Sequence, residues 1–235
     1  MEQDGKTCIL TEYDIEQYGE ATFSGDHKIK NGDFRRARSL MPFEYIDKAA
    51  KDFDWDIYGR VVPENGRKMS IAFVVNFQKF QSAGKGLYLY SGTRGSGKTL
   101  LACCLVNEVV NRYDLSVKFI SILDYLELTK KGYSSAADKE EKDSIMRSTI
   151  LVLDDIGVEV SKDWVNTTLY HLINFRYSNK LMTIVTSNCS IETLKIDDRI
   201  KDRLNAMCIP LHMPEISIRS KKASEENMEF LNSVM

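Results

Sequence analysis

Residues 86–99, GLYLYSGTRGSGKT, constrain the fold of this chain more than any other stretch. Leu87 to Tyr90 are branched and aromatic residues that suit a strand. Three glycines then fall within six residues, and LLACCLVNEVV, an apolar run typical of a helix, follows at 100–110. A strand, a loop of the form GxxxxGK[ST] and a helix, in this order, predict a phosphate-binding P-loop.

Each residue type in this loop has a chemical reason. Glycines allow consecutive backbone N–H groups to turn toward phosphate oxygens, and the N-terminus of the following helix adds a partial positive charge. Lys98 is placed to reach the β- and γ-phosphates, and the Thr99 hydroxyl is placed to ligate Mg²⁺. We therefore predict that ATP or ADP with Mg²⁺ binds at Gly92, Thr93, Arg94, Gly95, Ser96, Gly97, Lys98 and Thr99.

The composition is that of an ordinary globular chain: of 235 residues, 43% are hydrophobic and 28% are charged, and the net charge is −2. No overall positive field therefore indicates nucleic-acid binding, although a local basic patch is compatible with it. The five cysteines form no CxxC pair, and the three histidines complete no zinc-binding spacing. The odd cysteine count, the lack of a signal peptide and the lack of an apolar run of about 18 residues favour a cytoplasmic protein without membrane contact.

Strands and helices alternate along the rest of the chain. Further strands are expected at 116–122, 149–157, 181–188 and 207–213, and helices at 67–83, 123–133, 161–179 and 197–204. This alternation predicts an α/β fold of the P-loop NTPase class, in which helices cover both faces of a right-handed parallel sheet. Pro210 places the last strand at an edge of the sheet or interrupts it.

Apolar side chains indicate which surfaces pack together. The expected apolar side of helix 67–83 comprises Ile71, Val74, Val75, Phe77 and Phe80, and that of helix 161–179 comprises Trp164, Leu169, Leu172, Ile173 and Tyr177. The segment 41–60 is too aromatic for a linker in solvent, because it carries Phe43, Tyr45, Phe53, Trp55 and Tyr58. We expect these aromatic residues to pack on the nucleotide-binding domain, some of them near the base.

Three regions follow from these patterns. Residues 1–40 are polar and mixed in charge, with too few apolar residues for an independent core. They are expected to form an arm that is either mobile or docked on a partner, and a disordered tail without a role is an equally good interpretation. The nucleotide-binding domain is expected at 41–222, followed by a tail at 223–235.

Candidate residues for hydrolysis follow the expected strands. Asp154 ends a buried strand, where a carboxylate can reach Mg²⁺ through water, and the adjacent Asp155 can orient or deprotonate the attacking water. Asn188 ends the next strand and can hydrogen-bond the water or the γ-phosphate, although Thr-Ser-Asn is also an ordinary turn. Arg199 and Arg203 lie four residues apart and therefore share a helix face, which is either a catalytic surface or an ion-paired one.

Taken in order, these motifs resemble a known family. GTRGSGKT, LVLDDIG, IVTSN and DRIKDRL are similar to the corresponding stretches of the AAA+ helicase loaders of the DnaC/DnaI type, and the related transposition helpers of the IstB type share much of this pattern. The resemblance covers residues from about 41 to 222. It implies ATP and Mg²⁺, a role in DNA replication, a replicative hexameric helicase as partner, and self-assembly into a helical or ring oligomer on single-stranded DNA.

The resemblance also implies roles for individual residues. Lys98 and Thr99 match the Walker A lysine and threonine, and Asp154 and Asp155 match the Walker B pair. Asn188 matches sensor 1, Arg203 matches the arginine finger, with Arg199 as the less favoured alternative, and Arg219 matches sensor 2. Lys130, Lys131 and Tyr133 lie where the family has a DNA-contacting helical insertion; a solvated helix end is the alternative.

The sequence departs from the family in two places. Where glutamate is more usual in AAA+ proteins, this chain has Asp155, which is one methylene shorter, so a slow ATPase that is stimulated by assembly is expected. Some loaders begin with a zinc-bearing, helicase-binding domain, whereas the arm here has Cys8 as its one cysteine. The alternatives to a helicase loader are a transposition helper that binds duplex DNA and a transposase, a nucleotide-gated adaptor with little turnover, and, less favoured, a small-molecule kinase.

Overall fold

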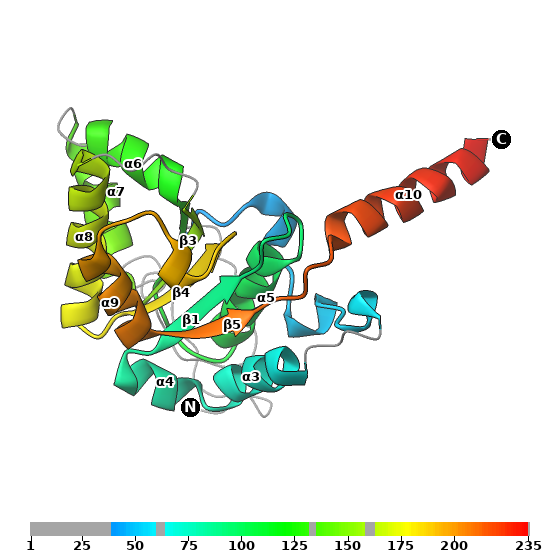
Figure 1. Cartoon of the computed structure of the whole chain (residues 1–235), viewed down its shortest axis with the longest axis horizontal. Helices are drawn as coiled ribbons and strands as arrows, with labels where there is room; N and C mark the ends of the chain where they lie inside the picture. Colours follow the sequence, from blue (N-terminus) through cyan, green and yellow to red (C-terminus); the bar gives the residue numbers. More distant parts are fainter. Residues whose placement is uncertain (1–38, 60–63, 132–134, 158–162, 235) are drawn as a thin grey trace, which may run out of the picture.

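The computed structural model describes residues 39–59, 64–131, 135–157 and 163–234. Its centre is a sheet of five parallel strands in the order β2-β3-β4-β1-β5 (Figure 1). The strands are β1 (Gly86–Tyr90), β2 (Val117–Ser121), β3 (Ile150–Ile156), β4 (Met182–Ser187) and β5 (Cys208–His212). The predicted parallel sheet is confirmed. Pro210 lies on an edge strand, because β5 pairs with β1 alone among the described strands.

Helices cover both faces of the sheet. One layer contains α3 (Glu64–Val75), α4 (Phe77–Ala83) and α5 (Lys98–Val110); the other contains α6 (Ile122–Lys131), α7 (Ala136–Arg147), α8 (Asp163–Ser178) and α9 (Asp198–Met207). Alternate residues of β3 enter the two cores: Ile150 and Val152 pack with the first layer, Leu151 and Leu153 with the second. A strand buried on both faces is mostly apolar, which is why Ile150 to Leu153 form a continuous apolar run ahead of Asp154 and Asp155.

The last helix, α10 (Ile218–Val234), projects away from the domain (Figure 1). It runs continuously across residue 222, where the sequence analysis placed the end of the nucleotide-binding domain. In the part of the chain that the structure describes, no helix combines the length and the apolarity that crossing a membrane would require. Residues 1–38 of the predicted arm 1–40 and Tyr133 lie outside the described residues.

The prediction of one helix at 67–83 is wrong. Two helices, α3 and α4, meet at Asn76, whose side chain donates to the carbonyl oxygen of Ala72 (3.1 Å). The predicted apolar side is also partly wrong, because Ile71 and Val75 are 55% and 67% exposed while Phe73 is buried. The buried stripe of α3 contains Gly66 and Ser70, which are small and therefore do not contribute to the apolar periodicity of the sequence.

The predicted apolar side of helix 161–179 needs a similar correction. Leu169, Leu172 and Ile173 of α8 are buried, as expected, but Trp164 and Tyr177 are exposed. Val165 and Arg176 are buried instead. The buried stripe has helical spacing, as predicted, and comprises Val165, Leu169, Leu172, Ile173 and Arg176. The prediction assigned the wrong residues to it because it chose positions by large apolar side chains.

Three short 3₁₀ turns in the segment before α3 pack against the first helix layer: η1 (Phe43–Tyr45), η2 (Ala50–Asp52) and η3 (Asp56–Tyr58). Phe53 and Tyr58 are buried, as predicted, whereas Phe43 is 92% exposed, contrary to the prediction. The buried amide of Asn107 on α5 fixes the segment, because its Nδ2 donates to the carbonyl oxygens of Tyr45 (2.8 Å) and Lys48 (2.7 Å).

Arg176 joins the second helix layer to the sheet. Its guanidinium is fully buried and donates to the carbonyls of Met146 (3.0 Å), Ser148 (2.9 Å) and Met182, and to Oγ1 of Thr183 (2.9 Å). Met146 and Ser148 lie at the C-terminal end of α7, where the helix dipole favours a cation. Burial lowers the pKa of Arg176 to about 9, so it remains protonated at neutral pH.

We expect Arg176→Leu to lower the free energy of unfolding by about 2–4 kcal/mol, because several buried carbonyl groups lose their donor. Arg112→Ala is the matched control, since Arg112 is half exposed and pairs with Glu108 one helical turn away (2.7 Å). It should change stability by less than about 0.5 kcal/mol. Urea titration of both variants measures the difference; equal effects would contradict the role assigned to Arg176.

Candidate functional site

The P-loop connects β1 to α5 at the carboxyl edge of the sheet. Gly95 and Gly97 have φ values of +71° and +87°, a region that favours glycine. A Cβ atom on Gly97 would lie 2.8 Å from Cδ1 of Ile218 and 3.0 Å from the hydroxyl of Tyr58. Tyr58 donates to the carbonyl of Ser96 (2.6 Å). Tyr58 therefore packs against the loop, and only glycine fits at position 97.

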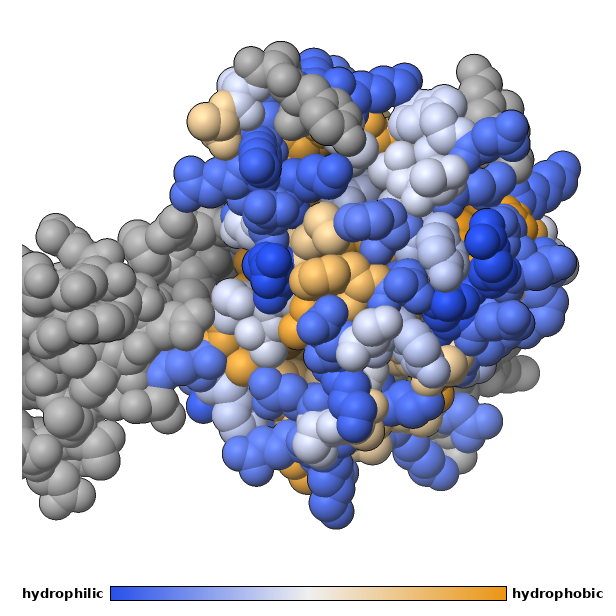
Figure 2. Space-filling model, turned by 90° about the vertical axis from the view of Figure 1, so that its left-hand side faces the viewer, coloured by the Kyte–Doolittle hydropathy of each residue, from blue (hydrophilic) through white to orange (hydrophobic). Residues whose placement is uncertain are grey.

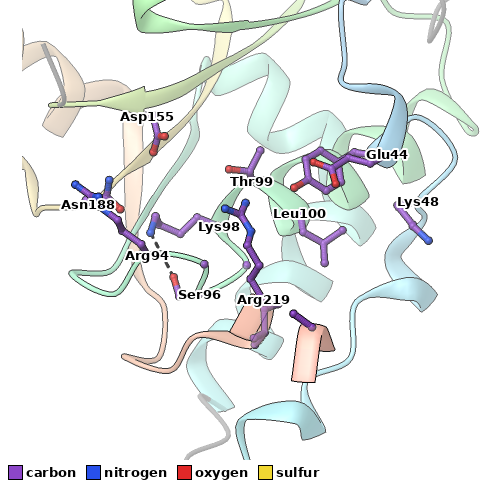
Figure 3. Close-up of a pocket in the computed structure, with 15 residues that line it drawn as sticks. Glu44, Lys48, Arg94, Ser96, Lys98, Thr99, Leu100, Asp155, Asn188 and Arg219 are labelled. Carbon is purple, nitrogen blue, oxygen red and sulfur yellow. Dashed lines mark hydrogen bonds between the residues drawn. The ribbon is translucent and has the colours of Figure 1, made fainter. Parts of the chain in front are cut away.

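Lys98 is the first residue of α5, and its side chain turns back to the P-loop. Its Nζ donates to the carbonyls of Ser91 (3.3 Å) and Thr93 (3.2 Å) and to Oγ of Ser96 (3.3 Å), the last drawn in Figure 3. Burial lowers the pKa of Lys98, and the negative charge of nearby Asp155 opposes this effect. The ammonium group is held by neutral acceptors at the loop, where a phosphate oxygen would be a stronger acceptor.

Asp154, at the end of β3, touches the P-loop helix. Its Oδ1 accepts hydrogen bonds from Thr99 Oγ1 (2.9 Å) and Thr186 Oγ1 (2.6 Å). Burial raises the pKa of Asp154, and the two hydroxyl donors partly oppose that shift. Two oxygen ligands that suit Mg²⁺, the Thr99 hydroxyl and the Asp154 carboxylate, therefore lie side by side.

Asp155 has a left-handed backbone, with φ of +57°, which is uncommon for a residue other than glycine. The pairing of β3 with β4 shifts register between Leu153 and Ile156, so Asp155 sits in an irregularity of the strand. Bulges of this kind re-aim a side chain. Here the carboxylate of Asp155 points into the pocket, toward Lys98 (Figure 3).

A pocket of about 750 Å³ unites most of the predicted residues. Those that line it are Arg94, Gly95, Ser96, Gly97, Lys98, Thr99, Asp155, Asn188 and Arg219. In Figure 3, Asp155, Asn188 and Lys98 lie on one side, the Arg219 side chain crosses the centre, and Glu44 and Lys48 close the opposite side. Tyr45 also lines the pocket, and its closeness to the base stays a prediction. Gly92, Thr93, Asp154 and Arg203 do not line it.

Arg219 belongs to a segment that runs along the P-loop. The backbone N–H groups of Ile218 and Arg219 donate to the carbonyl of Gly95 (2.9 and 3.2 Å). Desolvation raises the pKa of Tyr45 to about 12; the neighbouring Glu44 adds to this effect and Arg219 opposes it. The base of α10 is thus attached to the phosphate-binding loop, and Arg219 lines the pocket.

Glu215 is a residue that sequence reasoning missed. Its carboxylate accepts the backbone N–H groups of Gly92 (2.9 Å) and Thr93 (2.6 Å) and contacts Nε2 of His212 (2.9 Å). Burial alone would raise the pKa of Glu215, but these hydrogen bonds outweigh it and lower the pKa to about 2. No local pattern signals this contact, because more than 120 residues separate Glu215 from the loop it holds.

The remaining predicted residues lie elsewhere. Arg203 is on α9, in the helix layer across the sheet from α5 (Figure 1). The ammonium group of Lys130 lies 4.4 Å from the centre of the Trp164 ring, and Lys131 pairs with Glu127. Both lysines therefore have partners within the chain, and their contact with DNA stays a prediction.

The sheet order, the P-loop and the acidic residues of β3 together define a P-loop fold of the AAA+ class. The chain belongs to the IstB-like ATP-binding protein family, whose family model matches residues 74–226. The predicted resemblance to the DnaC/DnaI type is confirmed by relatives as well as by this match.

Among curated relatives, the replicative helicase loader DnaI of Bacillus subtilis (strain 168) is 31% identical over 170 residues, which are 68% of this chain and 52% of that protein. The replicative helicase loader DnaC of Escherichia coli (strain K12) is 27% identical over 121 residues, 50% of this chain and 49% of DnaC. The chain thus spans about half the length of these curated relatives.

Solved structures show the same fold. A crystal structure of DnaI superimposes with a TM-score of 0.61 at 25% identity, covering 74% of this chain and 95% of that one. The DnaC helicase loader gives 0.64 at 22% identity, covering 74% of this chain and all of that one. AMPPCP-bound DnaA from Aquifex aeolicus gives 0.61 at 20% identity, covering 81% and 56%.

We expect the stabilising effect of Glu215 to depend on pH. Its pKa is lower in the folded protein than its ordinary value of about 4.3. The carboxylate therefore contributes stability above about pH 5 and loses that contribution as pH falls toward about 2. The difference in free energy of unfolding between wild type and Glu215→Ala, measured from pH 7 to pH 3, should shrink as the pH falls. A difference that stayed constant would contradict the assigned hydrogen bonds.

Proposed function

We propose that this protein binds ATP with Mg²⁺ in the described pocket and hydrolyses it to ADP and phosphate, as part of loading a replicative helicase onto single-stranded DNA. One observation carries the catalytic part: the pocket brings together four separate parts of the chain, namely the P-loop, Asp155, Asn188 and Arg219. That convergence supplies phosphate-binding, water-orienting and charge-stabilising groups around one volume.

The pocket residues divide the work. Backbone N–H groups of the P-loop and the ammonium of Lys98 bind the β- and γ-phosphates. Thr99 and Asp154, which already share a hydrogen bond (2.9 Å), would hold Mg²⁺. When bound, Mg²⁺ neutralises charge on the phosphate oxygens. Asp155 orients the attacking water and accepts its proton, while Asn188 donates to the water or to the γ-phosphate.

We expect Asp154→Ala and Asp155→Ala to fail differently. Asp154→Ala should weaken Mg²⁺-dependent ATP binding, because a metal ligand is lost. Asp155→Ala should leave the Kd for ATP unchanged and lower kcat by roughly 10²-fold, because a general base acts in the transition state. Calorimetric titration and steady-state hydrolysis measure the two effects, with Lys98→Ala as the variant that loses tight binding. Wild-type turnover in Asp155→Ala would remove its assigned role.

Arg203 is proposed to act on the nucleotide of a neighbouring copy. It lies in the helix layer opposite to α5 and does not line the pocket of its own chain. Two different surfaces that meet head to tail generate a ring or a helical filament. The positive charge of Arg203 would then stabilise charge on the γ-phosphoryl group of the neighbour, a contribution worth roughly 10³–10⁵ in rate in other phosphoryl-transfer enzymes.

Mixing two inactive variants tests this arrangement. Arg203→Ala should bind ATP normally and lose the hydrolysis that assembly stimulates, whereas Lys98→Ala should lose ATP binding and keep its arginine. Mixed assemblies should regain activity, because Lys98→Ala subunits complete the pockets of Arg203→Ala subunits. Turnover that is independent of protein concentration and single-stranded DNA, with no recovery at any mixing ratio, would favour a monomeric nucleotide switch.

The partner is inferred from the relatives, since DnaI and DnaC are both helicase loaders by name. The match to the IstB-like family supports one other candidate, a transposition helper that binds duplex DNA and a transposase. The short Asp155 side chain supports an adaptor with little turnover. Isolation of the protein with its bound partners separates these functions: a hexameric helicase supports loading, a transposase overturns it, and recovery of neither favours the adaptor.

A further inference from the structure

The guanidinium of Arg203 is held at every nitrogen. Nε donates to Oδ1 of Asn174 (2.6 Å), Nη1 to the carbonyl of Arg199 (3.0 Å) and Nη2 to the hydroxyl of Tyr170 (3.0 Å). The group also lies 4.7 Å from the centre of the Tyr170 ring, within the range of a cation–π interaction. An arginine side chain in solvent samples many rotamers, so four simultaneous contacts fix an otherwise mobile cation.

These contacts leave part of Arg203 available. A guanidinium has five N–H groups, and the three hydrogen bonds use one on each nitrogen. One N–H therefore remains on Nη1 and one on Nη2, which form the fork that binds two oxygens of a phosphate or carboxylate. Among the residues that the structure describes, no carboxylate lies within ion-pair distance of Arg203; Asp197, whose charge also acts on Arg203, forms its ion pair with Arg199.

Arg199 differs in this respect. Its guanidinium binds Asp197 through Nε (3.0 Å) and Nη2 (2.8 Å), and it also lies 4.7 Å from the centre of the Tyr170 ring. Its charge is already paired. The sequence left the choice between the two arginines to family resemblance, whereas the contacts themselves favour Arg203 as the cation that is free to meet a phosphate.

The residues that hold Arg203 lie on two packed helices, α8 and α9. Tyr170 and Asn174 lie one turn apart on α8, and Arg199 and Arg203 lie one turn apart on α9, so each pair shares a helix face. Buried leucine and isoleucine residues of α8 and α9 belong to the same core and keep the helices in place. Figure 2, which faces this side of the molecule, shows a mainly hydrophilic surface with a small hydrophobic group near its centre.

We propose that Asn174 and Tyr170 are positioning residues for Arg203, which hold its guanidinium in the orientation that it presents to the nucleotide of a neighbouring copy. The inference rests on the proposed function of Arg203. Neither residue touches the nucleotide of its own subunit, because neither lines the pocket. Their effect should therefore appear in the rate of assembly-stimulated hydrolysis and not in ATP affinity.

Asn174→Ala should lower the assembly-stimulated kcat by roughly tenfold and leave KM and the Kd for ATP unchanged, because a fixed charge becomes mobile. Tyr170→Phe keeps the ring, whereas Tyr170→Leu removes both ring and hydroxyl. The assembly-stimulated kcat should therefore fall less in Tyr170→Phe than in Tyr170→Leu. Asn179→Ala is the matched control: Asn179 directly follows α8 and donates to its backbone, at Phe175 (2.7 Å), and no contact with Arg203 is among its hydrogen bonds. It should hydrolyse ATP like wild type.

Two further measurements separate positioning from folding. Mixing Asn174→Ala with Lys98→Ala should restore stimulated activity, because the Lys98→Ala subunit supplies a well-positioned arginine; a folding defect in Asn174→Ala would not be repaired in this way. The double variant Asn174→Ala/Arg203→Ala should be no slower than Arg203→Ala alone. If Arg203→Ala loses stimulation while Asn174→Ala and Tyr170→Leu keep it, the positioning role of Asn174 and Tyr170 is wrong, and the role of Arg203 as arginine finger is retained. If Arg203→Ala keeps stimulation, both are wrong.

Discussion

The two acidic residues of the site depend on one buried hydroxyl, that of Thr186 on β4. It donates to Oδ1 of Asp154 (2.6 Å) and accepts the backbone N–H of Asp155 (2.9 Å). The second of these bonds holds Asp155 in its left-handed conformation, which is unfavourable for an ordinary residue and persists only where its surroundings enforce it. A single side chain on the neighbouring strand thus sets the directions of both carboxylates, one toward Thr99 and the other into the pocket.

Much of the fold follows from sequence pattern because parallel sheets impose strong local constraints. Strands buried on both faces are mostly apolar, and P-loop glycines lie between a strand and a helix, so the order of elements can be predicted from the sequence. Pro210 predicts either an edge strand or an interrupted one, and the structure has the edge strand. The carboxyl ends of parallel strands meet at one edge of the sheet, which also brings Asp155 and Asn188 to the P-loop.

The remaining features depend on contacts between distant segments. Glu215 reaches the P-loop from more than 120 residues away, and nothing in its neighbours distinguishes it from a solvent-exposed glutamate. Arg176 appears in sequence as one more polar residue on a helix, yet it is buried because the end of α7 offers it several carbonyl groups. The break at Asn76 went unpredicted because helix periodicity shows neither where a helix ends nor which small residues lie against a neighbour.

The attachment of α10 has a mechanical consequence. Its first turn is bonded to the carbonyl of Gly95 in the P-loop, and Lys221 is bonded to the carbonyl of Ile57, while the rest of the helix extends from the domain. A helix of 17 residues is about 25 Å long at 1.5 Å per residue. A tilt of about 10° at its base would therefore carry its far end through about 4 Å, given that length. Sub-ångström shifts beside the phosphate-binding loop are thus amplified into displacements of several ångströms at the far end of α10. Exposed apolar residues, Met228 and Leu231 among them, lie near that end.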